Sequence, residues 1–131
     1  MATLVTGGSG FLGEALIRRL TGDIVVVGRN EGNLVKLKEK FPHVKIIVGD
    51  IADKHTCKKA LVGVDKVYHL AAMKHIGLAE QNVRECIMSN VIGTLNLLEE
   101  FDGEFIVLTS TDKAAQVSGV YGATKLLAER L

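Results

Sequence analysis

The sequence predicts a single α/β domain built on a doubly wound parallel sheet. Short apolar runs rich in β-branched residues alternate with longer amphipathic stretches along all 131 residues. The apolar runs are continuous, as expected for strands that are buried on both faces. The length suits one domain, and a composition that is 47% hydrophobic and 24% charged is sufficient to form one core.

Five strands and five helices are expected to alternate along the chain. Pro42, the only proline, marks the end of the second helix. Right-handed crossovers would place the strands in the order 3-2-1-4-5, with a ligand crevice at the carboxyl edge where the order reverses. The expected strands are residues 2–6, 24–27, 44–48, 66–70 and 105–108, and the expected helices are residues 11–20, 32–41, 54–61 and 78–100 and one that begins near residue 121.

Composition narrows the functional classes. The formal net charge is +1, which gives no electrostatic reason to expect nucleic-acid binding. Cys57 and Cys86 lie far apart without a metal-ligand spacing, so we expect neither a metal site nor a disulfide, and a reducing cytoplasm fits best. No apolar run approaches the ~20 residues that span a bilayer, and no signal peptide is visible, so we expect no membrane attachment.

A glycine-rich loop follows the first strand and opens the first helix. Gly7 would permit a tight turn, Gly10 would let the backbone approach a pyrophosphate, and Gly13 would let the helix pack closely on the strand. The N–H groups at the start of that helix would attract phosphate. We therefore expect a dinucleotide on this loop, although glycines that only mark a turn are the alternative. The expected contacts are Gly7, Ser9, Gly10, Phe11, Leu12 and Gly13.

The residues after the second strand bear on the choice of cofactor. NAD-binding domains usually place an acidic residue there, to bind the ribose 2′-hydroxyl, but this chain reads Gly28-Arg29-Asn30. The planar guanidinium of Arg29 suits the 2′-phosphate of NADP, and a solvated surface arginine is the alternative. We therefore expect NADP, contacted by Arg29 and Asn30, with NAD as the second choice.

Tyr121 and Lys125 lie four residues apart and therefore share one face of a helix. A phenol has a pKa of about 10, and a neighbouring ammonium group together with a positively charged nicotinamide favours its ionised form. Tyr121 is therefore expected to act as a general base, tuned by Lys125. The spacing alone occurs by chance in many helices, so its weight comes from the glycine loop and the strand pattern.

Several motifs together resemble a known family. The glycine spacing resembles that of extended short-chain dehydrogenases/reductases, whose dinucleotide domain is the Rossmann fold. The run Ser110–Ala115 and its ten-residue step from Thr111 to Tyr121 resemble the inverting UDP-N-acetylglucosamine 4,6-dehydratases of polysaccharide biosynthesis. The resemblance also includes 71–75, 90–94 and 121–125, and so extends over essentially the whole chain.

The resemblance implies further cofactor contacts. Asp50 and Ile51 would lie at the adenine, and Ala71, Ala72 and Lys74 on the nicotinamide side. For Lys74 and His75 an ordinary polar loop is an equal alternative. Asn90 resembles the family's helix asparagine, which keeps a local kink and a water molecule, and a buried, satisfied amide is the alternative. Tyr121 and Lys125 would contact the cofactor as well.

The resemblance also implies catalytic roles for the residues after the fifth strand. Thr111 would hold the C4 oxygen of a UDP-sugar, Lys113 would remove the C5 proton, and Asp112 would protonate the departing C6 hydroxyl. Elimination would follow oxidation at C4, and reduction at C6 would leave a 4-keto-6-deoxy sugar. The alternative is that Asp112 and Lys113 only cap the strand.

Enzymes of this family continue well beyond the helix that holds Lys125. We therefore expect residues 1–131 to be one NAD(P)-binding Rossmann domain, truncated before the substrate-binding part. An uncovered sheet edge would favour a homo-oligomer. Two other functions stay open: a UDP-sugar 4-epimerase, which the Asp112-Lys113 pair disfavours, and a dinucleotide-binding module without catalysis.

Overall fold

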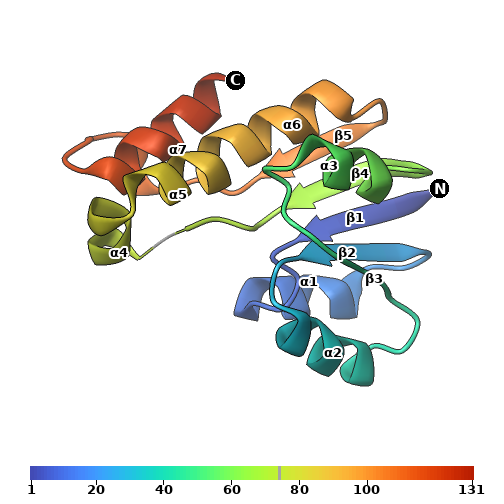
Figure 1. The fold of residues 1–131 in the computed structure, drawn as a ribbon. Helices are drawn as coiled ribbons and strands as arrows, with labels where there is room; N and C mark the ends of the chain where they lie inside the picture. Colours follow the sequence, from blue (N-terminus) through green and yellow to red (C-terminus); the bar gives the residue numbers. More distant parts are fainter. Residues whose placement is uncertain (74) are drawn as a thin grey trace.

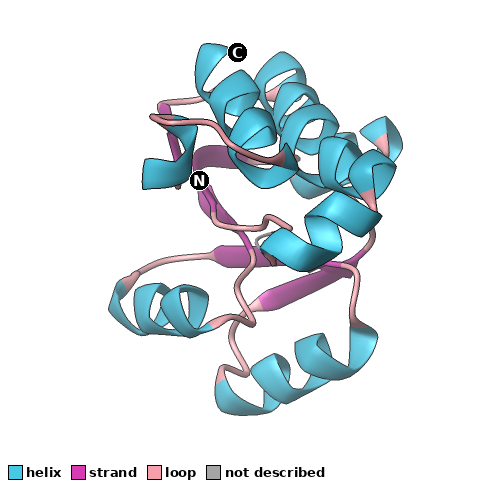
Figure 2. Cartoon of the chain, turned by 90° about the vertical axis from the view of Figure 1, so that its left-hand side faces the viewer, coloured by secondary structure: helices cyan, strands magenta, loops and turns pink. Residues whose placement is uncertain are grey.

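The computed structural model describes residues 1–73 and 75–131 and contains one parallel sheet covered by helices on both faces (Figures 1 and 2). The strands lie in the order β3-β2-β1-β4-β5, which confirms the predicted doubly wound topology. All neighbouring strands are parallel, and Leu4 of β1 is in register with Val25 of β2 and Val67 of β4. The strands are β1 Ala2–Thr6, β2 Ile24–Gly28, β3 Lys45–Val48, β4 Val64–His69 and β5 Phe105–Leu108.

Each face of the sheet has its own hydrophobic cluster. Successive side chains of β2 point to opposite faces, so Val26 packs with α1 and α2 whereas Val25 packs with α3 and α6. Burial on both faces explains why the strand sequences are continuous apolar runs. The helices are α1 Phe11–Arg19, α2 Glu31–Lys40, α3 Lys54–Ala60, α4 Ile76–Gln81, α5 Val83–Ile87, α6 Gly93–Glu100 and α7 Val120–Arg130.

The prediction of one continuous helix over residues 78–100 is wrong, because the structure divides this range into several helical segments. Asn82 leaves helical geometry, with φ −132° and ψ 58°, and separates α4 from α5. A π-helical turn, η1 Met88–Ile92, then lies between α5 and α6. The side chain of Asn90 within this turn bonds to the backbone of Met73, outside the helix, and π-helical turns are frequent at functional sites.

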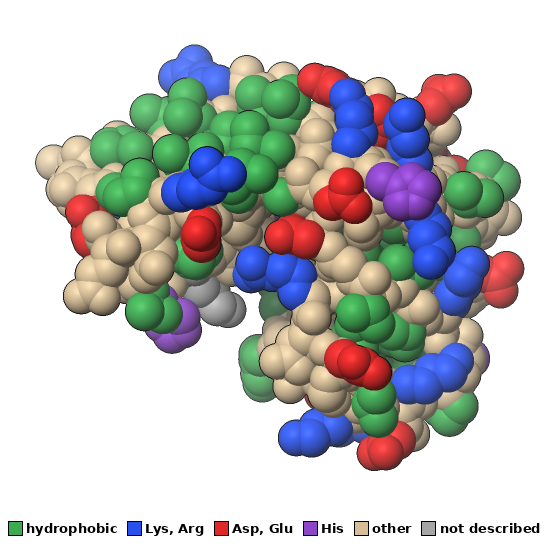
Figure 3. Space-filling view, in the orientation of Figure 1, with side chains coloured by type: hydrophobic (Ala, Val, Ile, Leu, Met, Phe, Trp, Pro, Cys, Tyr) green, Lys and Arg blue, Asp and Glu red, His purple; other side chains and the backbone are tan. Residues whose placement is uncertain are grey.

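The outer helices carry exposed apolar side chains. They gather on the face formed by α5, α6 and α7, seen at the upper left of Figure 3. Ile87, Leu98 and Leu127 are among the exposed hydrophobic residues of these helices. Contiguous patches of this kind are common at protein–protein contacts. In the described part of the chain, no helix combines the length and the apolar character that crossing a bilayer requires.

His69, at the end of β4, is 2% exposed and is held by two threonine hydroxyls. Burial, and secondarily the positive charge of Lys125, lowers its pKa from 6.5 to about 4. The folded state thus favours neutral imidazole, and the unfolded chain binds more protons between these two values. Stability from this residue is complete above about pH 6.5 and is lost as the pH falls towards 4.

We expect acidification from pH 7 to about pH 4 to cost on the order of 3 kcal/mol of unfolding free energy through His69 alone. Denaturant unfolding of the wild type and of His69→Gln at both pH values measures this contribution. Carboxylates titrate in both proteins, so the difference between them isolates the histidine. Equal losses in the two proteins would contradict the assignment.

Candidate functional site

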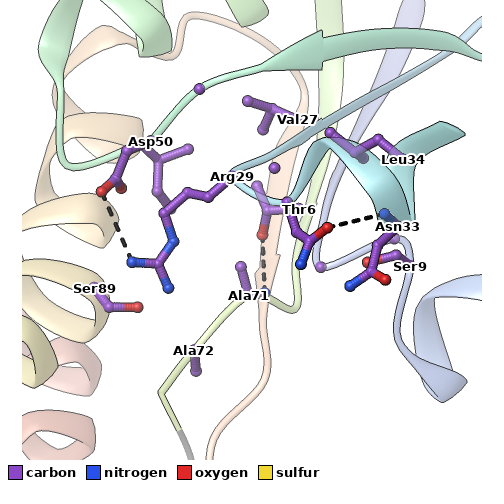
Figure 4. Close-up of a pocket in the computed structure, with 16 residues that line it drawn as sticks. Thr6, Ser9, Val27, Arg29, Asn33, Leu34, Asp50, Ala71, Ala72 and Ser89 are labelled. Carbon is purple, nitrogen blue, oxygen red and sulfur yellow. Dashed lines mark hydrogen bonds and ion pairs between the residues drawn. The ribbon is translucent and has the colours of Figure 1, made fainter.

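A cavity of about 370 Å³ lies at the carboxyl edge of the sheet, where the connections from β1 and β4 diverge (Figure 4). Parallel strands bring the ends of β1, β2, β3 and β4 together there, which is the expected position of a ligand in this topology. The cavity is lined by Thr6, Gly7, Gly8, Ser9, Val27, Gly28, Arg29, Asn30, Asn33, Leu34, Gly49, Asp50, Ile51, Ala71, Ala72 and Ser89.

The glycine loop has little room for side chains. Gly7 has a positive φ of 70°, and a Cβ there would lie 2.8 Å from the backbone nitrogen of Ala71. A Cβ on Gly13 would lie 2.6 Å from the Cα of Gly8, so Gly13 packs closely against the glycine loop. The sequence had suggested close packing against the strand. Gly10 donates its N–H to the carbonyl of Gly7 at 3.1 Å, which closes the turn. The loop is therefore compact and presents backbone.

Helix α1 begins directly after this turn, at Phe11. Its N-cap is Gly10, which has no side chain to bond the N–H groups of the first turn. Phe11 is 95% exposed and Leu12 57% exposed, and neither lines the cavity. If these two residues contact a cofactor as predicted, they do so through backbone N–H groups at the positive end of the helix dipole.

Arg29 lies at the rim of the cavity, paired with a carboxylate that follows the neighbouring strand. Its Nη1 is 4.0 Å from Oδ2 of Asp50, and both side chains are substantially exposed, so the pair contributes little to stability (Figure 4). No acidic residue follows β2 directly, but the fold brings Asp50 from the end of β3. Asn30 uses its side-chain oxygen to cap α2, accepting from the N–H of Asn33 at 3.0 Å.

The segment after β4 forms the opposite wall. Ala71 and Ala72 line the cavity, and the N–H of Ala71 donates to Oγ1 of Thr6 at 3.0 Å. Lys74 lies outside the described residues. Asn90 is 1% exposed, does not line the cavity and lies in the π-helical turn η1. Its side chain binds both the N–H and the carbonyl of Met73.

The predicted catalytic residues lie on two adjoining segments, the 3-10 turn η2 Asp112–Ala114 and helix α7. Thr111 donates its hydroxyl to Asp112 at 3.2 Å, and the ammonium of Lys113 lies 3.8 Å from the same carboxylate oxygen. Asp112 and Lys113 are exposed, whereas Tyr121 is half-buried. The turn therefore offers an acid and an amine to solvent.

Lys125 is 3% exposed and donates from Nζ to the carbonyl of Thr109 at 2.8 Å. Burial lowers the pKa of Lys125, and the nearby Glu129 opposes this effect. A buried ammonium one turn after Tyr121 is consistent with the electrostatic role that the spacing predicted. Lys125 does not line the cavity itself.

Gly122 accounts for the contact between the two catalytic segments. A Cβ at this position would lie 2.5 Å from the carbonyl oxygen of Lys113, which packs directly on the first turn of α7. The absence of a side chain thus brings the Thr111–Lys113 segment next to Tyr121. This contact brings together the two segments that carry the predicted catalytic residues, which are separated by up to fourteen positions in sequence.

We expect Gly122→Ala to lower the free energy of unfolding by about 1–3 kcal/mol, because the added methyl group must displace backbone. Gly77→Ala is the matched control, since Gly77 is also helical and its Cβ would have open space. Alanine there should stabilise the protein by up to about 1 kcal/mol. Thermal unfolding of both variants measures the effects. Equal melting temperatures would contradict the packing argument.

Some cavity residues were not predicted from the sequence. Thr6 lies at the end of β1, and Asn33 lies in the first turn of α2. Polar residues at such positions, close to a glycine loop, could have been predicted to line the cavity. Ser89 reaches the cavity from the π-helical turn, and no sequence pattern indicates such a turn.

The sequence model of a family described as polysaccharide biosynthesis protein matches residues 3–131. Relatives include an uncharacterised membrane protein of Methanocaldococcus jannaschii, 43% identical, and an inverting UDP-N-acetylglucosamine 4,6-dehydratase of Campylobacter jejuni, 35% identical. A UDP-glucose 4-epimerase of Rickettsia massiliae is 31% identical. Each alignment covers 98% of this chain and 41% of the relative, so the chain spans about two fifths of their length.

Solved structures share this fold. The structure of Pen from Bacillus thuringiensis superposes with a TM-score of 0.93 at 32% identity, over 98% of this chain and 43% of that one. The structure of MoeE5 in complex with UDP-glucose and NAD superposes with a TM-score of 0.82 at 26% identity, over 99% of this chain and 47% of that one.

Proposed function

Because the chain belongs to the polysaccharide biosynthesis protein family, we propose that it is the cofactor-binding and catalytic portion of an NADP-dependent UDP-N-acetylglucosamine 4,6-dehydratase. One observation carries the proposal: the turn with Thr111, Asp112 and Lys113 packs on the first turn of the helix that holds Tyr121 and Lys125. In the proposal, Tyr121 is the base for C4 oxidation, and the adjoining turn supplies the acid and the amine for elimination. The 35% identical dehydratase supports the assignment.

A dinucleotide would bind in the cavity at the carboxyl edge of the sheet. A side chain on Gly7 or Gly13 would collide with backbone, so the loop keeps a surface that a pyrophosphate can approach. The N–H groups at the start of α1 would bind the phosphates, and Ala71 and Ala72 would let the nicotinamide lie close. When bound, NADP would take a hydride from C4 of the sugar and return it to C6.

The chain's own groups would handle the protons. Tyr121 would take the C4 hydroxyl proton while Thr111 donates a hydrogen bond to the C4 oxygen. The resulting ketone acidifies the C5 hydrogen, which Lys113 would remove as Asp112 gives a proton to the departing C6 hydroxyl. The structure pairs the half-exposed Lys113 with Asp112, whereas the step needs an uncharged amine and a protonated carboxyl. The proposal therefore requires the bound sugar to shield the pair from water, so that the proton moves from Lys113 to Asp112.

A UDP-sugar 4-epimerase is the second candidate, favoured by the relative of that name at 31% identity. Epimerisation needs oxidation and reduction at C4 only, and so has no use for a second acid–base pair beside the tyrosine. The exposed Asp112 and Lys113, 3.8 Å apart and next to the Tyr121 helix, therefore favour the dehydratase.

Calorimetric titration with NADP and with NAD, each followed by UDP-N-acetylglucosamine, tests the cofactor assignment. We expect NADP to bind about 10–100-fold more tightly, because a charge-assisted hydrogen bond to phosphate contributes roughly 1.5–3 kcal/mol. Arg29→Ala should remove most of this preference and leave NAD affinity within about twofold. Asp50→Asn is the companion variant, because it removes the charge that competes for Arg29.

A response to the sugar nucleotide after cofactor binding would support a working substrate pocket. An Arg29→Ala variant that still prefers NADP would show that residues other than Arg29 bind the 2′-phosphate. Failure of both cofactors to bind would overturn the proposed function.

A further inference from the structure

A chain of buried polar side chains runs beneath the cavity from β1 to α7. Its members are Thr6, His69, Thr94, Asn90 and Thr124, and each is at most 4% exposed. Of these five, only Thr6 lines the cavity. In the described residues no buried side-chain nitrogen or oxygen lacks a hydrogen-bond partner, so every polar group of this network is hydrogen-bonded.

The directions of the bonds near His69 follow from their partners. Thr6 Oγ1 accepts from the N–H of Ala71, which leaves its own hydrogen for Nδ1 of His69 at 2.6 Å. Thr94 donates its hydroxyl to the carbonyl of Asn90 and therefore accepts from Nε2 of His69 at 3.0 Å. This arrangement requires a neutral imidazole with its proton on Nε2.

The other half of this network reaches helix α7, which holds Tyr121. Asn90 holds Met73 through two bonds, accepting from its N–H at 2.8 Å and donating to its carbonyl at 3.0 Å. The same Asn90 amide nitrogen lies 3.0 Å from Oγ1 of Thr124. Thr124 donates in turn to the carbonyl of Tyr121 at 2.8 Å.

The network therefore holds two parts of the site in place. Through Thr6 and Asn90 it holds both ends of segment 71–73, the wall of the cavity that includes Ala71 and Ala72. Through Thr124 it holds the first turn of α7, where Tyr121 lies. Reactions that depend on a near-attack geometry lose about 10²-fold in rate when the groups shift by 1 Å.

We propose that His69 and Thr124 are positioning residues that hold the cofactor wall, residues 71–73, at a set distance from Tyr121. The proposal rests on the proposed function for the role of Tyr121. His69 acts on the wall, through Thr6 and Thr94, and Thr124 acts on Tyr121 and on Asn90. The two residues should therefore affect different measured quantities.

Thr124→Val keeps the shape of the side chain and removes its hydroxyl, whereas Thr124→Ser keeps the hydroxyl. In Thr124→Val we expect the amide of Met73 to exchange with solvent deuterium about tenfold faster by NMR, because its partner Asn90 loses an anchor. In turnover of UDP-N-acetylglucosamine, kcat should fall about tenfold or more with KM unchanged. Thr124→Ser should restore both.

His69→Phe keeps a buried ring without hydrogen bonds, and His69→Gln retains a donor and an acceptor. His69→Phe should speed exchange at the amide of Ala71 and weaken cofactor binding about tenfold, since this segment lines the cavity. His69→Gln should recover part of both effects. Amides of β2 residues 24–26, whose partners in β1 are not members of this network, serve as the internal reference.

Each outcome decides the matter. Local exchange changes at Met73 and Ala71, with rescue by the conservative variants, support the proposal. Changes that spread equally to β2, or a kcat and KM that move together, would reduce the network to a general contribution to stability and overturn it. If the wild type binds neither cofactor, the proposed function fails, and the exchange data still decide whether this network holds the wall.

Discussion

Replacing Tyr121 by Phe is expected to lower kcat about 10²–10⁴-fold while leaving the cofactor dissociation constant within about twofold. The phenol is the proposed proton acceptor in C4 oxidation, and its loss removes general base catalysis without adding or removing volume in the core. Lys125 one turn later is buried against the carbonyl of Thr109 and would remain in place. Steady-state turnover together with calorimetric cofactor binding measures both quantities.

Tyr68→Phe is the matched control for this variant. Tyr68 is the other of two tyrosines, and it packs edge-on against Phe105 in the sheet, with ring centroids 5.8 Å apart. Loss of its hydroxyl should leave kcat nearly unchanged. If Tyr121→Phe retains more than about a tenth of wild-type kcat, Tyr121 is not the base.

Gly7→Ala is expected to abolish measurable cofactor binding and to lower the free energy of unfolding by about 2–4 kcal/mol. Two costs add at this position. Its φ of 70° is unfavourable for any residue with a Cβ, and that Cβ would lie 2.8 Å from the nitrogen of Ala71 and 2.9 Å from the carbonyl carbon of Leu70. Both neighbours are backbone, so the loop and the cavity wall must separate.

Gly63→Ala separates the two costs. Gly63 has a similar φ of 71°, but a Cβ there would meet nothing within 4 Å. Only the conformational cost of about 1–2 kcal/mol should appear, and cofactor affinity should be unaffected. Denaturant unfolding and cofactor titration of both variants test the comparison. Equal destabilisation would mean that the loop accommodates the methyl group.

The strand order could be predicted because it depends on few physical rules. Continuous apolar runs identify strands buried on both faces, and right-handed crossovers leave few arrangements for the alternating pattern. A tight turn at Gly7 was likewise expected, and the positive φ found there is one that a residue without Cβ adopts most readily. The motif resemblance assigned Tyr121 and Thr111–Lys113 to one reaction, and Gly122 gives a packing reason why their two segments adjoin.

The remaining features depend on tertiary contacts that local patterns do not encode. Residues 78–100 have a helical composition, but the bonds of Asn90 to Met73 accompany a π-helical turn within them. The pairing of Arg29 with Asp50 joins the ends of two strands. His69 carried no pattern at all, because its role depends on Thr6 and Thr94, distant residues that only the sheet brings together.

We propose that the enzyme of which this chain is the cofactor-binding and catalytic portion eliminates water across C5 and C6 of a UDP-sugar after oxidation at C4. The most direct measurement is incubation with NADP and UDP-N-acetylglucosamine in D₂O, with the product followed by NMR and mass spectrometry. The account predicts a 4-keto-6-deoxy sugar with deuterium from solvent at C5, and no such product from Lys113→Met. A C4 epimer without deuterium at C5, or cofactor binding with no product, would contradict it.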